Sequence, residues 1–232
     1  MKKILVLVVG ALAALALIFS TTGCGSSSGS SVSMKTANSD DSQAAVTALN
    51  NAKEIKVKKA LINFGGDSWK ITADGKDVGQ IKGQAFKVIG DTYSLYTPAG
   101  NFVGAESEQY RIVNHTAKTF NFNGQQDGAI SQELHWPLDV YTFTDAAGKK
   151  IGSMDQDFSL TLSGTAKDTT GTAAWSFSKA AFAMSSDITV KRETSNKIPA
   201  LTAVWAAVIM IEVADAKNSD SGSSSNSSKS HK

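Results

Sequence analysis

The chain has 232 residues, of which 41% are hydrophobic and 19% charged, and it contains one cysteine. This composition allows a buried core and excludes a wholly disordered chain, while a single cysteine excludes a disulfide scaffold and a cysteine-rich zinc module. Without Lys2 and Lys3, which lie in a segment that looks removable, 21 basic residues balance 21 acidic ones. A neutral balance does not indicate nucleic acid as a partner.

The first residues of the chain predict an export signal. In residues 1–20 two lysines precede an uncharged apolar stretch, and small residues then lead to the cysteine at position 24. The segment resembles a bacterial lipoprotein signal, in which the peptidase cuts before the cysteine and its thiol carries diacylglycerol. Gly23 fits the position before the cut, whereas Thr21 stands where leucine is usual. The resemblance implies a signal peptide over 1–23 and lipid attachment at Cys24, with the protein anchored to the extracytoplasmic face of the cell membrane.

An uncleaved N-terminal anchor with an incidental cysteine is the alternative, because the apolar run is long enough to suggest a membrane anchor. Residues 24–42 are Gly/Ser-rich and polar, so they predict a flexible linker of roughly 20–25 Å. Residues 217–232 contain no apolar residue and predict a disordered tail. The folded domain is therefore expected over residues 43–216.

Glycines recur in pairs four residues apart through the middle of the chain. The first members of successive pairs are 25, 24 and 24 residues apart. The pairs are Gly75 and Gly79, Gly100 and Gly104, Gly124 and Gly128, and Gly148 and Gly152. Three copies read ITADGKDVG, YTPAGNFVG and TDAAGKKIG, and the copy FNFNGQQDG is degenerate. Each copy predicts a strand, a turn with glycine at positive φ and a returning strand.

Runs of alternating apolar residues support this interpretation. Tyr93 and Leu95 form one such run and Tyr141 and Phe143 another, and a third covers 158–162. A period of two with one apolar face is typical of half-buried strands. The repeat of about 24 residues therefore predicts a meander of antiparallel hairpins.

A helix is predicted on each side of the strands. Residues 43–53 form a short amphipathic helix that Asp41 or Ser42 caps. Residues 198–213 are predicted to form the second helix, and its first fourteen residues carry no charge. Fourteen helical residues are about 21 Å long, shorter than the roughly 30 Å hydrocarbon core of a bilayer. A helix that is apolar on every side is buried in protein or in lipid, and the sequence leaves both open.

The predicted elements follow one another as hairpins, then strands, then an apolar helix. The hairpins are at 72–79, 97–104 and 145–152, the strands at 158–162 and 188–191, and the helix at 198–213. In this order they resemble the tubby C-terminal-like superfamily, in particular its LURP-one-related branch, which includes relatives of phospholipid scramblases. The resemblance implies a mainly β fold, a closed antiparallel barrel of twelve strands around a hydrophobic C-terminal helix. Phosphoinositide-binding members use clustered basic side chains, and Arg111 and Arg192 are the only arginines here, so that ligand is not expected.

The sequence contains none of the common catalytic or metal-binding motifs. It has no phosphate loop, G-x-S-x-G, H-E-x-x-H or calcium loop. His115 and His135 are 20 residues apart without a carboxylate at helical spacing, and His231 lies in the predicted tail. We therefore expect no catalytic residue, no metal site and no cofactor.

Two pairs of carboxylates are the remaining candidates for catalysis. Glu106 and Glu108, and Asp155 and Asp157, are two residues apart, so each pair points to one face of a strand at about 6–7 Å. Paired carboxylates at such distances can hydrolyse glycosides. The interpretation that we favour places both pairs on the outer face of the sheet, in water.

Aromatic and basic residues allow two interpretations each. Trp205 is expected in the core, whereas Trp136 either closes a barrel end or contacts a ligand. Lys56 and Lys58, within a cluster that includes Lys53 and Lys59, share one strand face. They either approach anionic lipid headgroups or solubilise an edge strand.

The sequence thus predicts a lipid-anchored, non-catalytic module that binds a lipid, a wall component or a protein, through residues that it does not identify. Its partners are expected to be membrane lipid, through Cys24, and an envelope ligand, with no nucleic acid. The alternatives are a scramblase-like protein that acts on membrane lipids, a hydrolase that uses one acidic pair, and a structural envelope protein.

Overall fold

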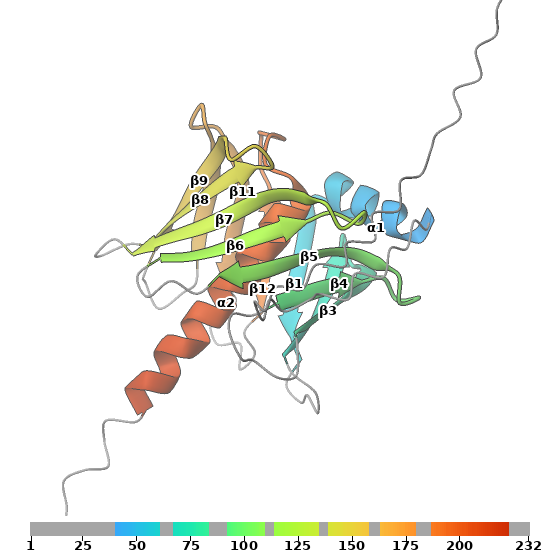
Figure 1. The fold of residues 1–232 in the computed structure, drawn as a ribbon, viewed down its shortest axis with the longest axis horizontal. Coiled ribbons are helices and arrows are strands. Elements are labelled where there is room, and N and C mark those ends of the chain that lie inside the picture. The colour runs from blue at the N-terminus through green and yellow to red at the C-terminus, as the bar shows by residue number, and fades with distance from the viewer. Residues whose placement is uncertain are drawn as a thin grey trace, which may run out of the picture. The chain divides into compact units, whose positions relative to one another are not determined.

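Alternating apolar residues build twelve antiparallel strands, which close into a barrel (Figure 1). The computed structural model describes residues 40–60, 67–83, 92–109, 114–134, 139–157, 163–179 and 187–222. In chain order the elements are α1 (Asp40–Asn51), β1 (Glu54–Lys59), β2 (Ser68–Ala73), β3 (Lys76–Gly83), β4 (Thr92–Tyr96), β5 (Phe102–Gln109), β6 (Asn114–Phe120), β7 (Gln126–Leu134), β8 (Asp139–Asp145), β9 (Lys150–Asp157), β10 (Ser163–Asp168), β11 (Ala173–Lys179), β12 (Ile188–Arg192) and α2 (Ala200–Gly222).

Each strand pairs with its neighbours in sequence, and β1 pairs with β12 to close the ring. The closure is antiparallel, with Ile55 opposite Val190. The predicted fold class, a closed antiparallel barrel of hairpins with a hydrophobic C-terminal helix, is confirmed.

Four of the hairpins end in the same five-residue turn. In each turn the N–H of the first residue donates to the carbonyl of the fifth residue. The carbonyl of the first residue accepts the N–H of the fourth residue, which is a glycine. The side-chain oxygen of the first residue also accepts the N–H of the fifth. The turns begin at Thr97, Asn121, Asp145 and Asp168. Their glycines have φ between 73° and 86°, a region that other residues rarely adopt.

The second glycine of the repeat lies where the next strand comes very close. A Cβ atom on Gly128 would lie 2.5 Å from the carbonyl oxygen of Thr144, and one on Gly152 would lie 2.5 Å from that of Lys167. The same relation joins Gly104 to Phe120 at 2.8 Å. The glycine pairs therefore mark a structural repeat, and the degenerate third copy adopts it as well.

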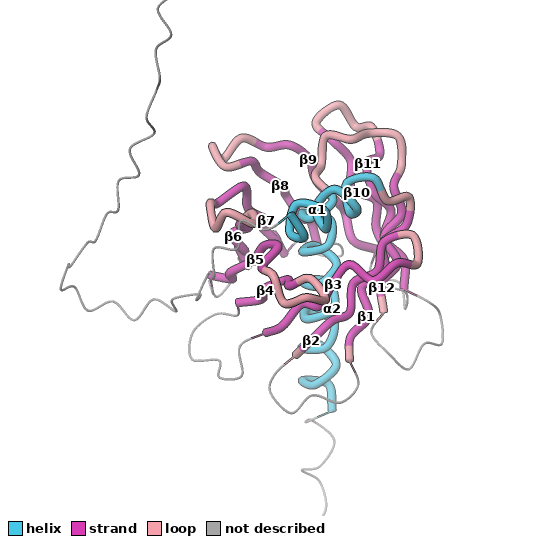
Figure 2. Tube along the Cα trace, turned by 90° about the vertical axis from the view of Figure 1, so that its right-hand side faces the viewer, coloured by secondary structure: helices cyan, strands magenta, loops and turns pink. Residues whose placement is uncertain are grey.

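The C-terminal helix α2 runs inside the barrel (Figure 2). No residue from Ala203 to Ile211 exposes more than 3% of its surface, because the inner faces of the strands surround the helix. The indole of Trp175 donates to the carbonyl of Ile198 at 2.9 Å and holds the segment that leads into it. The structure therefore places this apolar stretch in protein. Within the described part of the chain, no helix combines the length and hydropathy that crossing a membrane requires.

Both helices differ in length from the sequence prediction. α2 begins two residues later than expected and continues to Gly222, beyond the predicted end at 213. α1 begins at Asp40, so Ser42 is not a cap but lies within the helix and donates through its hydroxyl to the carbonyl of Phe102 at 2.7 Å. Asp40 and Asp41 occupy the first turn, where carboxylates favour the positive end of the helix dipole.

Asp168 ties the last five-residue turn to the segment before α2. Its carboxylate accepts hydrogen bonds from the hydroxyls of Thr170 at 2.6 Å and Ser195 at 2.7 Å, and Lys197 lies 3.2 Å away. The Thr170 and Ser195 hydrogen bonds outweigh burial and hold the pKa of Asp168 well below its usual range.

Candidate functional site

A groove lies between α1 and the turns of the β2–β3 and β4–β5 hairpins, with a volume of about 490 Å³. We call it the α1 groove. Ala44, Ala45 and Ala48 line it from the helix, and Ala73, Val78, Pro98 and Ala99 from the two hairpins. Asp41, Asp74, Asp77 and Lys76 also line it. A concave site with a mostly apolar lining and a few polar groups, in this range of volume, is typical of ligand pockets.

Figure 2 shows α1 over one end of the barrel, and side chains from distant parts of the chain hold it there. The guanidinium of Arg192 donates to the carbonyl of Ala52 at 2.9 Å and to that of Asn50 at 2.5 Å. Leu49, which is 1% exposed, packs into the core. These contacts fix the helical wall of the α1 groove against the strands that form the other wall.

The aspartates of the groove are held by specific partners. Asp74 adopts φ 47° in the tight β2–β3 turn, and its carboxylate accepts the N–H groups of Lys53 and Glu54 at 3.0 Å. Asp41 accepts from the side-chain amide of Asn101 at 2.9 Å. Asp77 forms an ion pair with Lys70 at 2.9 Å. The positions of the Asp41 and Asp74 carboxylates are therefore largely set before any ligand binds.

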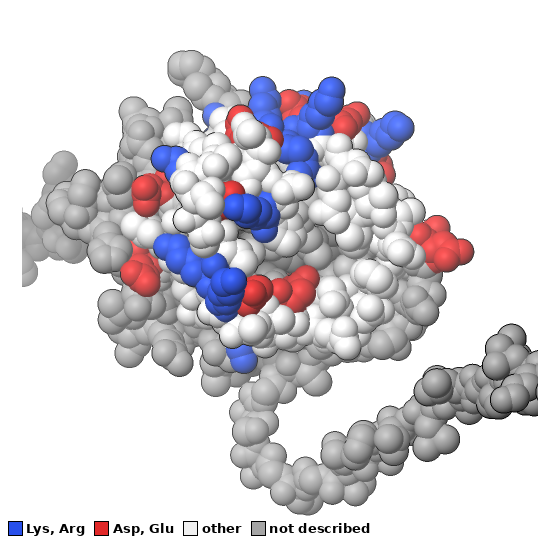
Figure 3. Space-filling view, turned by 90° about the horizontal axis from the view of Figure 1, so that it is seen from above, with Lys and Arg blue, Asp and Glu red and all other residues white. Residues whose placement is uncertain are grey.

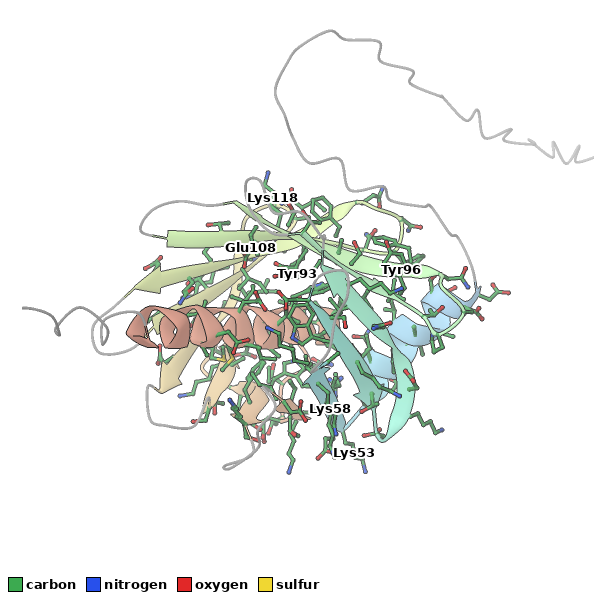
Figure 4. All side chains as sticks on the ribbon, turned by 90° about the horizontal axis from the view of Figure 1, so that it is seen from below. Lys53, Lys58, Tyr93, Tyr96, Glu108 and Lys118 are labelled. Atoms are coloured by element: carbon green, nitrogen blue, oxygen red, sulfur yellow. The ribbon has the colours of Figure 1, made fainter. Side chains whose placement is uncertain are left out.

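A second polar cluster lies where α2 passes the C-terminal end of β1, and its side chains are partly buried. Lys59 contacts Glu212 at 3.2 Å and Asp215 at 2.6 Å on α2, and Asp67 at 3.4 Å. Tyr93, seen beside α2 in Figure 4, donates to the other oxygen of Glu212 at 3.0 Å. Burial lowers the pKa of Lys59, but the Asp215 hydrogen bond and the nearby carboxylates outweigh it, so the pKa is raised above its usual value.

This cluster was not found by the sequence reasoning, although the pattern of β1 contained a signal for it. Ile55 and Val57 point inward, so the period of two also directs Lys59 inward. Lys56 and Lys58 do share one strand face, as predicted, and it is the outer face; Figure 4 shows Lys58 and Lys118 on opposite sides of that view. The edge-strand interpretation of these lysines is wrong, because β1 is paired on both sides.

The prediction that both acidic pairs lie in water is wrong for Glu106. This side chain is 0% exposed and lies opposite Tyr93 on the inner face of the barrel. Asp155 is exposed on the outer face, as expected, and the side chain of Asp157 lies outside the described residues. Glu106 and Asp155 therefore face opposite sides of the sheet.

The other predicted residues divide into those in the core and those outside the described residues. Trp205 is completely buried, as predicted. Several predicted features lie outside the described residues: Cys24, His135, Trp136, the strand at 158–162 and the side chain of His115. Among the described side chains, no group of three or more potential ligands is arranged to hold a metal ion.

Charged side chains of both signs are interspersed on the surface seen in Figure 3. Glu54 illustrates this on the outer face of the barrel, because it lies 3.2 Å from Lys56 and 3.9 Å from Lys191. On the face seen in Figure 3, the described side chains therefore form no extended area of one sign. The α1 groove is therefore the candidate site that we carry forward.

Comparisons with known proteins give no match to this chain: none to a protein-family model, none to a curated protein and none to a solved structure.

Proposed function

We propose that this protein is a lipid-anchored, extracytoplasmic binding module without catalytic activity, and that its ligand occupies the α1 groove. The observation that carries the proposal is the groove itself, an apolar concavity of about 490 Å³ built from three separate parts of the chain. Its ligand is a lipid, a wall component or a protein segment. The signal sequence and Cys24 supply the argument for the anchor.

Membership of the tubby C-terminal-like superfamily, near its LURP-one-related branch, is part of the same proposal. It is supported by twelve antiparallel strands that close around a hydrophobic C-terminal helix. A shared fold does not by itself establish a shared activity, so the scramblase-like alternative needs an argument of its own. Such an activity would be expected to bring α2 into contact with lipid, and its burial inside the barrel favours the binding module.

The hydrolase alternative also receives little support. A pair of catalytic carboxylates needs one acid with a raised pKa and one charged partner in a cleft that holds substrate. Asp155 is exposed on the outer face, whereas Glu106 is enclosed beside Tyr93. We therefore do not retain hydrolysis as a second function.

Substitution of Cys24 tests the anchor. If its thiol is the acylation site, Cys24→Ala abolishes metabolic labelling with a radioactive fatty acid and leaves a longer, unprocessed precursor on a gel. Equal labelling of the variant and the unmodified protein would remove the lipoprotein assignment, and with it the proposed location.

A ligand screen with two matched variants tests the binding site. The purified full-length protein is screened by thermal shift against phospholipid headgroups, wall fragments and short peptides. Ala48→Trp fills the α1 groove, whereas Thr47→Trp places the same bulk on an exposed part of α1 outside its lining. Binding should be lost only in Ala48→Trp. Hits that survive this variant, or conversion of a hit to product in chromatography, would contradict the proposal.

A further inference from the structure

The α1 groove carries an excess of negative charge. Its lining contains three carboxylates, those of Asp41, Asp74 and Asp77, against one ammonium group, that of Lys76. Lys70 approaches from the outer face of β2 and pairs with Asp77 at 2.9 Å, but its side chain is 59% exposed. An exposed pair of this kind contributes little free energy, so a ligand cation can compete for Asp77.

Beneath the carboxylates the groove is apolar. Ala45 is 8% exposed, and Ala73 and Val78 are each 5% exposed, so these three residues form the buried floor of the groove. Ala44 and Ala48 leave the helical wall open because their side chains are short. A lysine or arginine side chain combines an aliphatic stem with a charged end, and this combination matches an apolar floor below an acidic rim.

Resting on the proposed function, we propose that the ligand of the α1 groove is cationic, and specifically a short peptide segment that inserts a lysine or arginine side chain. The stem lies over Ala45 and Val78, and the cation reaches Asp77. Asp41 contributes less, because it lies in the first turn of α1, where the helix dipole already offsets part of its charge. Asp74 is likewise engaged by two backbone N–H groups.

Isothermal titration of the full-length protein in detergent micelles tests this ligand class. The probe is a capped tripeptide, acetyl-Ala-Lys-Ala-amide, and its controls replace lysine by norleucine or by glutamate. The lysine peptide should bind at least about five-fold more tightly than the norleucine peptide, and the glutamate peptide should not bind. Raising the salt from about 20 to 300 mM should weaken the lysine peptide several-fold, since exposed charges are screened over a shorter distance.

Four variants locate the interaction. Ala48→Trp should abolish binding and Thr47→Trp should leave it unchanged. Asp77→Asn should weaken the lysine peptide at least about five-fold with little effect on the norleucine peptide. Lys70→Gln removes the competing cation and should strengthen binding about two- to three-fold, which a merely structural role of Asp77 would not produce.

Each outcome separates this inference from the proposed function. Absence of lysine-peptide binding, equal binding of the norleucine peptide, or lysine-peptide binding that survives Ala48→Trp would overturn the cationic ligand. If neutral or anionic compounds from the screen still bind and are lost in Ala48→Trp, the binding module stands with another ligand. If no compound responds to Ala48→Trp, both proposals fail.

Discussion

Lys59 differs from its neighbours on β1 because its ammonium group lies inside the barrel. Its side chain is 20% exposed, against 53% for Lys58, and it meets Glu212 and Asp215 from α2. A partly buried charge that loses its partners costs more than an exposed one. This residue therefore fastens the helix to the barrel wall by electrostatics, in addition to the apolar packing along the rest of α2.

Replacing Lys59 by methionine should lower the free energy of unfolding by about 1–3 kcal/mol, less than for a completely buried pair. The pKa of Lys59 is raised in the folded state, so its stabilisation is complete below the unfolded value of 10.5 and is lost as the pH rises above it. Urea denaturation between pH 7 and 11 measures this. Lys58→Met, as control, should change stability by less than about 0.5 kcal/mol.

Asp168 should have the opposite dependence on pH. Its pKa is lowered by the Thr170 and Ser195 hydrogen bonds, so its stabilisation is present above the unfolded value of 3.8 and is lost as the pH falls below it. Asp168→Asn should therefore flatten the fall of the urea midpoint below pH 4. A variant whose acid profile parallels that of the unmodified protein would contradict this assignment.

At the scale of the hairpin, the two glycines of each repeat have different roles. The first adopts positive φ in open space, with no atom within 4 Å of a Cβ atom on Gly148. The second faces a neighbouring backbone carbonyl, as Gly128 faces Thr144 at 2.5 Å. The first is therefore required by the conformation of the turn and the second by the spacing of the strands.

Alanine substitutions should separate these roles. Gly148→Ala should cost about 1 kcal/mol, the strain of a left-handed residue. Gly128→Ala should cost about 3 kcal/mol, near the upper end of overpacking, since a carbonyl cannot rotate away as a side chain can. Thermal unfolding of both variants measures the difference. Equal costs would mean that the strands separate freely at Gly128.

The hairpins were predictable because a turn glycine leaves a local signal, but the face to which each strand residue points was only partly predictable. A shift of 48 residues aligns Glu106 with Met154, which is 1% exposed, and so indicated that Glu106 faces inward. The outer-face prediction followed polarity instead of this alignment. The fourth five-residue turn was also missed: it keeps Gly171, but Trp175 replaces the second glycine.

The α1 groove could not be predicted, because it joins α1 to two turns through contacts that leave no mark in sequence spacing. Ser42 bonds a residue 60 positions away, and Arg192 reaches α1 over about 140 positions. Alanine is common in helices for reasons of propensity, so Ala44 and Ala48 gave no sign of lining a site. Asp77 lies beside this wall only because α1 packs against the β2–β3 hairpin.

At the scale of the whole molecule, α2 fills the space that twelve strands enclose. Val208 is 0% exposed, so an aspartate there would be a buried charge without an ion-pair partner. Such a charge costs several kcal/mol, against a total stability of about 5–15 kcal/mol. Val208→Asp should therefore unfold the domain, with loss of the far-ultraviolet strand signal. Thr202→Asp, in the half-buried first turn, should remain folded; unchanged strand content in Val208→Asp would place α2 outside the core.

Because β1 pairs with β12, the ring cannot close until the last strand has been made. Ile55 cannot pair with Val190 before then, although each intervening hairpin can pair as soon as both of its strands are available. Contacts that are this distant in the chain form slowly, and α2 follows β12, so the core must be filled at about the time of closure. Until then the sheet has two unpaired edges and an uncovered apolar face. The time that the chain spends open, rather than the stability of the finished barrel, then sets its exposure to proteases and to aggregation.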